Sequence, residues 1–296
     1  MRERFPDGQK HFMPIRFLII DGYAKASRDD FDLVGMKHAA QLYAEMLKRW
    51  LPEAECIFWF PSDDLNPPEG KGPEHYAGIL WTGCNLTVYH RDNPSVARQI
   101  EFAARSFDAG TPAFGSCWGL QVAAAAAGGT VSANPRGREM GIARKIQLTP
   151  EGRKHPMLEG RAPVFSGFIS HLDEVTELPP GAVLLATNDF THVQAMEVRH
   201  GKGTFWAVQY HPEYDLHEMA RLITARAQKL LPEGFFAGPE DLAGYVEKLE
   251  ALNRDPDRKD LRWQLDIDDD VLSDEVRQLE FRNWINKVVL PRATGA

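Results

Sequence analysis

One strand-to-helix junction constrains the fold of this chain more than any other feature. Pro112–Gly115 has the composition of a short buried strand, and the Ala-rich run Trp118–Ala127 predicts a helix directly after it. Cys117 stands between the two, with Gly115 and Gly119 two residues to either side. This G-x-C-x-G spacing predicts a sharp turn, in which a side chain at either glycine would crowd neighbouring elements.

Strand-like and helix-like runs alternate along the chain up to about residue 212. Further apolar strands are expected at Arg16–Ile20, Ala54–Phe60 and Gly78–Thr82, and further helices at Met36–Trp50 and Pro94–Asp108. Strands that are apolar throughout and separated by helices indicate a parallel sheet covered on both faces. We therefore predict a three-layer α/β sandwich with a central, mostly parallel sheet.

The pattern changes between residues 141 and 209, where short strands are separated by turns. They are expected at Ala143–Leu148, Val164–Ile169, Val183–Ala186, Gln194–Val198 and Thr204–Val208. Such a series predicts an antiparallel or mixed edge added to the parallel sheet.

The C-terminal part is charged, helical in period and without strand runs, with helices expected at Leu216–Leu231, Pro239–Leu252 and Ser273–Val289. We divide the chain into an N-terminal tail (1–14), an α/β domain (15–232) and a helical C-terminal extension (233–296). The last helix carries a broad apolar stripe that includes Phe281 and Trp284. Such a stripe is expected to pack on the α/β domain of the same chain rather than on a second copy.

Charge and cysteine content exclude several classes of protein. The net charge of −8 and the pI near 5.7 argue against a nucleic-acid binder, and the short cluster Arg136–Arg138 is expected to be a solvated loop. Three cysteines without a C-x-x-C pair suit a reducing compartment. No apolar run reaches the roughly 18 residues that a membrane span needs. We expect a cytoplasmic protein that binds neither nucleic acid nor membrane.

A second motif, His211-Pro212-Glu213, follows the strand that ends near Val208. A helix N-terminus favours the thiolate form of a cysteine, a histidine can serve as its base, and a carboxylate can orient the imidazole. We therefore predict a catalytic triad of Cys117, His211 and Glu213. The alternative is an inert buried cysteine and a histidine in an ordinary strand-to-helix turn.

Together these motifs resemble the class I glutamine amidotransferases, whose signature is G-x-C-x-G-x-Q followed far downstream by H-P-E. Residues 82–89 are similar to the T-G-S-x-x-S-V-Y segment of stand-alone members that resemble the glutaminase part of GMP synthase. Residues 170–175 resemble the S-H-x-D-x-V segment of the same members. The resemblance covers roughly residues 15–230 and implies the flavodoxin-like fold of that family.

The resemblance also implies residue roles. Cys117 would attack the γ-carboxamide carbon of glutamine and form a glutamyl thioester, His211 would transfer protons, and Glu213 would orient His211. The oxyanion would be stabilised by the backbone N–H groups of Gly83 and Trp118. The amino-acid end of the substrate would be held by Gln121, Ser170 and His171.

The chain departs from the family pattern in two places. Thr82-Gly83-Cys84 replaces the usual Gly-Gly-Pro oxyanion loop, with Gly83 retained and Cys84 expected to be a packing residue. Trp118 is bulky where many relatives carry an aliphatic residue, which predicts a narrowed glutamine pocket.

The expected function is a glutaminase that releases ammonia from glutamine and supplies it to a partner synthase subunit. One alternative is a γ-glutamyl amide or peptide hydrolase that uses the same triad, and another is a non-catalytic binding module. No histidine or cysteine has metal-ligand spacing, and no Walker-type or G-x-G-x-x-G phosphate loop occurs. We expect neither a metal nor another cofactor.

Overall fold

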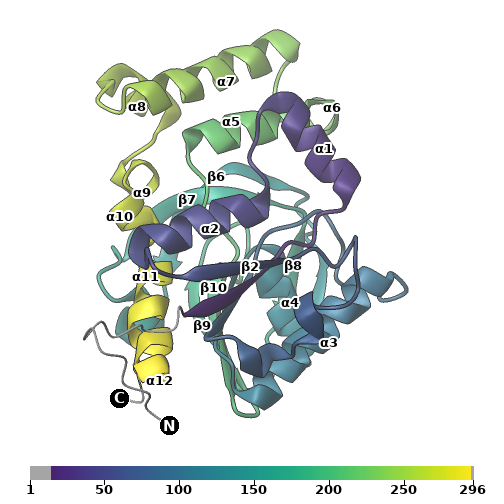
Figure 1. Cartoon of the computed structure of the whole chain (residues 1–296). Coiled ribbons are helices and arrows are strands. Elements are labelled where there is room, and N and C mark those ends of the chain that lie inside the picture. The colour runs from purple at the N-terminus through teal and green to yellow at the C-terminus, as the bar shows by residue number, and fades with distance from the viewer. Residues whose placement is uncertain (1–14, 295–296) are drawn as a thin grey trace, which may run out of the picture.

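The computed structural model describes residues 15–294, and the predicted N-terminal tail 1–14 lies outside this range. A sheet with the strand order β2-β1-β3-β4-β11-β10-β9-β6-β7 forms the centre of the described chain (Figure 1). None of the helices in this range is long and apolar enough to cross a membrane.

The sheet has a parallel half and an antiparallel half. The parallel strands are β1 (Arg16–Ile20), β2 (Glu55–Trp59), β3 (Gly78–Trp81), β4 (Ala113–Ser116) and β11 (Gly203–Val208). The antiparallel strands are β6 (Glu139–Leu148), β7 (Val164–His171), β9 (Ala182–Thr187) and β10 (Ala195–His200). The predicted α/β fold with a mostly parallel core and an added antiparallel edge is thus confirmed.

Two short strands form a separate antiparallel pair that the sequence pattern did not predict. They are β5 (Thr130–Ala133) and β8 (Asp173–Glu177). β8 directly follows β7, so the pairing joins the segment after His171 to the segment that contains β5.

Helices cover both faces of the parallel strands, because alternate strand residues point to opposite sides. On β1, Phe17 and Ile19 belong to a core cluster with α2 (Ala39–Trp50). Leu18 and Ile20 belong to a second cluster with α3 (Pro94–Ala109) and α4 (Trp118–Ala126). Figure 1 shows α3 and α4 on one side of the sheet and α2 on the other.

A further group of helices packs together around α5 and forms a third core cluster. They are α1 (Lys25–Val34), α5 (Leu216–Ala225), α6 (Ala227–Leu230), α7 (Pro239–Arg254), α8 (Lys259–Leu265) and α9 (Asp269–Leu272). Buried side chains from α1, α5, α7, α8 and α9 belong to one cluster. The helix α1 was not predicted.

The predicted helix Ser273–Val289 is divided into α10 (Asp274–Arg277), α11 (Leu279–Trp284) and a π-helical turn (Ile285–Val289), followed by α12 (Leu290–Thr294). The division lies at Gln278, whose side-chain oxygen accepts hydrogen bonds from Arg49 (3.1 Å) and from the indole N–H of Trp50 (2.9 Å). The break therefore allows a polar side chain to tie the segment to α2.

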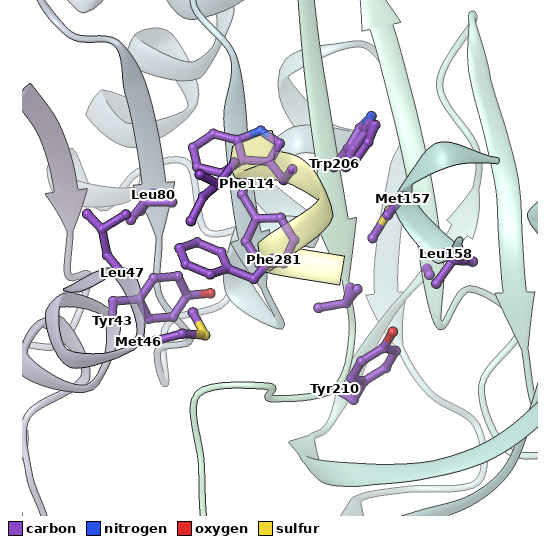
Figure 2. Packing of buried hydrophobic residues seen from close by; sticks show 14 of the residues in the cluster. Tyr43, Met46, Leu47, Leu80, Phe114, Met157, Leu158, Trp206, Tyr210 and Phe281 are labelled. Atoms are coloured by element: carbon purple, nitrogen blue, oxygen red, sulfur yellow. The ribbon is translucent and has the colours of Figure 1, made fainter. Parts of the chain in front are cut away.

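The apolar stripe of this segment packs on the α/β domain of its own chain, as expected. Phe281 and Trp284 are fully buried. The ring of Phe281 packs edge-on against the ring of Phe114 on β4, with 5.2 Å between the ring centroids. The ring centroids of Trp284 and Phe17 on β1 are 6.1 Å apart. Figure 2 shows Phe281 among side chains of α2, β3 and β4. The C-terminal segment thus completes one of the two core layers.

Candidate active site

Cys117 occupies a sharp turn between β4 and α4. Its backbone has φ 50° and ψ −96°, a conformation that L residues rarely adopt, and its N–H donates to the carbonyl of Val208 on β11 (2.8 Å). The turn aims the residue out of the carboxyl end of the parallel sheet, where ligands of open α/β sheets bind. The cysteine also immediately precedes the first residue of α4, where backbone N–H groups and the helix dipole favour an anion.

The glycines on either side of Cys117 are required by close packing, as predicted. A Cβ atom on Gly115 would lie 2.8 Å from the Cα of Gly119, and a Cβ on Gly119 would lie 2.9 Å from the Cβ of Trp81. Both distances are shorter than real Cβ contacts allow. The spacing of the motif therefore serves the approach of α4 to β3 and β4.

His211 lies beside Cys117 and is held on all sides. Its backbone N–H donates to Phe168 (2.8 Å), its Nδ1 lies 2.7 Å from Glu213 Oε1, and its ring stacks on Tyr214 at 4.2 Å. Its Nε2 is buried and makes no well-formed hydrogen bond with the residues that the structure describes. That nitrogen is therefore available to the thiol and to a substrate.

The charge state of His211 follows from its neighbours. Burial by itself lowers the pKa of His211, but the Glu213 carboxylate and the adjacent Cys117 side chain outweigh burial and raise the pKa from 6.5 to about 9. Both neighbours favour the protonated imidazole, so His211 is suited to accept a proton from the thiol and to pass it on to a leaving group.

The raised pKa of His211 predicts a pH dependence of folding. A group whose pKa is higher in the folded state stabilises the fold below its unfolded pKa of 6.5, and this stabilisation is lost as the pH rises through about 9. At 1.36 kcal/mol per pH unit it amounts to about 3 kcal/mol. Urea unfolding at pH 6 and at pH 9.5 should show this loss for the wild type. A His211→Gln variant should show a clearly smaller difference, and an equal difference would contradict the expectation.

Glu213 is oriented by a buried chain of hydroxyl groups. Ser116 Oγ donates to Glu213 Oε1 (3.1 Å), and Tyr43 OH of α2 donates to Ser116 Oγ (2.7 Å). Both hydroxyl side chains are fully buried. The carboxylate oxygen that contacts His211 is therefore fixed from its other side by the core.

Gly83 lies against both members of the Cys117–His211 pair. A Cβ atom on Gly83 would lie 2.6 Å from His211 Cε1 and 3.7 Å from the Cβ of Cys117. The hydroxyl of Thr82 donates to the Gly83 carbonyl (2.9 Å), which fixes the adjoining peptide group. The predicted oxyanion role of the Gly83 and Trp118 N–H groups remains a prediction.

The expectation that Trp118 narrows the pocket is wrong. Its indole is fully buried in the core between α3 and α4, and its Nε1 donates to Gln99 (2.8 Å). Trp118 is the first residue of α4, and the packing of α4 turns its side chain into the core. The size of the Trp118 side chain therefore does not affect the width of the pocket.

A cavity of about 430 Å³ opens at Cys117. The three predicted substrate-binding residues, Gln121, Ser170 and His171, all line it. Gln121 donates from its amide nitrogen to the Asp173 carbonyl (3.0 Å), and the Ser170 carbonyl accepts from the Cys117 thiol (3.6 Å). The structure therefore brings these residues and the predicted triad together, while their roles in binding remain predictions.

Both ring nitrogens of His171 contact other groups of the protein. Its Nδ1 lies 2.9 Å from the Asp173 carbonyl and its Nε2 lies 3.0 Å from Glu139 Oε2. Burial raises the pKa of Glu139, but hydrogen bonds from His171, Asn188 and Thr191 outweigh it and lower the pKa. This network fixes the wall of the cavity, so His171 can reach a substrate only through its backbone or the face of its ring.

Several residues that line the cavity were not predicted. Arg226, at the end of α5, and Asp173 both contribute to its wall. Arg138 was expected in a solvated loop, but it also lines the cavity and pairs with Glu233 (2.7 Å). Asp173 belongs to the S-H-x-D-x-V segment and could have been predicted from it, whereas no sequence motif contains either arginine.

Among residues 15–294, no set of three or more histidine, cysteine, aspartate or glutamate side chains is arranged to hold a metal ion.

Cys117 in a sharp turn at the carboxyl end of β4 lies beside His211, which in turn contacts Glu213. This is the arrangement that the sequence predicts for a cysteine-dependent amidohydrolase. The family model for glutamine amidotransferase class-I matches residues 58–228. The chain belongs to the class I glutamine amidotransferase family and is an amidohydrolase-type enzyme.

Two kinds of relative are similar to this chain. A γ-glutamyl-L-1-hydroxyisopropylamide hydrolase from a Pseudomonas species is 35% identical over 286 residues, which cover 94% of this chain and 95% of the relative. The GMP synthase of Methylobacillus flagellatus is 30% identical over 190 residues, which cover 58% of this chain and 31% of the relative. The chain thus spans less than a third of that GMP synthase and nearly all of the hydrolase.

Solved structures show the same fold. A glutamine amidotransferase from Thermotoga maritima has a TM-score of 0.66 at 16% identity, covering 95% of this chain and 99% of its own. A glutamine amidotransferase from Methylobacillus flagellatus has a TM-score of 0.58 at 18% identity, covering 91% of this chain and 94% of its own.

Proposed function

We propose that the chain hydrolyses γ-glutamyl amides, with Cys117 as nucleophile. The observation that carries the proposal is the arrangement at the cavity: the Cys117 thiol opens into it, His211 lies beside the thiol, and Glu213 holds His211 at 2.7 Å. This is the nucleophile, base and orienting group that acyl transfer through a thioester requires.

The proposed reaction has two halves. The thiol gives its proton to His211, and the sulfur attacks the γ-carbonyl carbon. The C–N bond then breaks as His211 protonates the leaving amine, which yields a γ-glutamyl thioester on Cys117. In the second half His211 takes a proton from water, whose oxygen attacks the thioester, and glutamate leaves as the thiol is restored. Backbone N–H groups of Gly83 and Trp118 would stabilise the oxyanion in both halves.

Substituted amides are the substrates that the comparisons favour. The hydrolase relative matches the C-terminal helices as well as the α/β domain, whereas the GMP synthase relative matches only part of either chain. In the structure those helices complete the core on which β4 and the Cys117 turn rest.

The second candidate, a glutaminase that passes ammonia to a synthase subunit, is favoured by the GMP synthase relatives. A cytoplasmic location suits the three free cysteines.

Substrate comparison tests the proposal. We expect the purified chain alone to release glutamate from γ-glutamyl amides of small amines, such as γ-glutamyl-hydroxyisopropylamide, with kcat/KM on the order of 10-fold or more above that for glutamine. Differences of this size are what one additional apolar group in a pocket contributes. A coupled glutamate assay measures both substrates, and the corresponding α-glutamyl amides are the control that should not react. A chain that prefers glutamine, or that acts only with an added synthase, would favour the glutaminase instead.

A further inference from the structure

Arg226 presents an uncompensated positive charge in the cavity wall. The residue ends α5 and lines the same cavity as Cys117. Its guanidinium donates to Ser170 Oγ and to Tyr23 OH (3.2 Å), both of which are uncharged groups. Among the residues that the structure describes, no carboxylate lies within ion-pair distance of Arg226, although Glu233 lies within reach of its electric field. A half-buried guanidinium without a counter-charge favours an anionic ligand.

A second arginine in the same wall provides the contrast. Arg138 is held by Glu233 through two hydrogen bonds of 2.7 and 3.1 Å, so its charge is already neutralised. Lys229 also lines the cavity, but it is exposed to solvent. Asp30 and Asp173 line the cavity too, so the pocket offers groups of both signs. Arg226 is the described cation that combines partial burial with hydrogen-bond partners that leave its charge unpaired.

Ser170 connects Arg226 to the Cys117 thiol in the wall of the cavity. Ser170 contacts both: its carbonyl oxygen accepts from Cys117 Sγ at 3.6 Å, and its hydroxyl oxygen accepts from Arg226. Both groups therefore contact one residue of the cavity wall, through two different oxygen atoms. In a γ-glutamyl group four C–C bonds separate the carbonyl carbon from the α-carboxylate carbon, which is about 5 Å when extended.

We propose that Arg226, together with the Ser170 hydroxyl, binds the α-carboxylate of the γ-glutamyl substrate. This inference rests on the proposed function and names the residue that selects the acyl half of the substrate. A guanidinium and a carboxylate form paired hydrogen bonds with fixed geometry, so this contact would contribute mainly to the affinity for the substrate. Tyr23, fully covered beneath α1, holds the guanidinium in place.

Matched arginine variants test the assignment. Arg226→Gln should raise KM for γ-glutamyl amides on the order of 10- to 100-fold, the loss expected for a hydrogen bond to a charged group, with kcat within a few-fold of wild type. Arg226→Lys should retain part of the affinity. Arg138→Gln, from the same wall, should change KM less than about threefold. For 4-aminobutyramide, which lacks the α-carboxylate, wild type and Arg226→Gln should be equally slow.

Binding of free L-glutamate to the full chain, measured by calorimetry, separates this inference from the proposed hydrolysis. If no γ-glutamyl amide is turned over but wild type binds glutamate and Arg226→Gln does not, the hydrolase proposal fails and the carboxylate site stands. If Arg226→Gln binds glutamate as tightly as wild type does, the assignment to Arg226 is overturned. The assignment is also overturned if Arg138→Gln loses as much affinity for glutamate as Arg226→Gln does. If Arg226→Gln loses as much activity toward 4-aminobutyramide as toward γ-glutamyl amides and also has a lowered Tm, the role of Arg226 is structural. That result would also overturn the assignment.

Discussion

Replacing Cys117 by alanine is expected to reduce kcat for the best γ-glutamyl substrate by at least about 10⁴-fold without unfolding the protein. The thiol would form the covalent intermediate, and Cys117 is the cysteine that lies with His211 against Gly83. Initial rates of glutamate release measure the effect, with circular dichroism as the check on folding. Cys56→Ala is the matched control, because Cys56 lies on β2, on the opposite side of β1 from β3 and β4. This variant should hydrolyse the substrate at a rate within about twofold of wild type.

The members of a triad act as one unit, so their losses should not add. Cys117→Ala combined with His211→Ala should be about as inactive as Cys117→Ala alone. Substantial turnover by Cys117→Ala, or a double variant that is slower by the product of the single effects, would contradict the assigned roles.

The second large effect concerns stability. Phe281→Ala should lower the free energy of unfolding by about 3–5 kcal/mol, the usual loss for a buried phenylalanine. Phe281 is fully buried, and its ring contacts Phe114 at 5.2 Å and Trp284 at 5.8 Å. Urea denaturation measures the change.

Trp263→Ala on α8 is the control for this experiment. Trp263 is 82% exposed, so removing an aromatic ring of similar size there should change stability by no more than about 0.5 kcal/mol. If the two variants are equally stable, the C-terminal segment does not form part of the core.

Much of the sheet could be predicted because its strands have strong local signals. β1 begins and ends where its apolar run does, and α4 begins at Trp118 as expected. Other elements lack such a signal. α1 is mostly polar and buries only Arg28 and Phe31, so it has no continuous apolar stripe. β8 is acidic and pairs only with β5, so its strand state depends on a distant partner. The division of domains at residue 232 remains a prediction.

The candidate site divides in the same way. Cys117, His211 and Glu213 lie at element ends, where short motifs reveal them. Tyr43 reaches the site from the side of α2, and Arg226 reaches it from the end of α5, where no motif marks it. Which side of a helix faces a cavity depends on how the helix packs in three dimensions, and a sequence pattern without a motif does not contain that information.

The packing of Phe281 and Trp284 also affects how the protein is made. A ribosome completes β1 and β4 long before it reaches residue 281, so Phe17 and Phe114 lack part of their cover until that part of the chain has been synthesised. Apolar surface exposed in this way invites aggregation or chaperone binding, and a nascent chain released early would keep it exposed. Closure of this core layer therefore has to wait until residues 281–289 have been synthesised, whereas the strands that they cover are made much earlier.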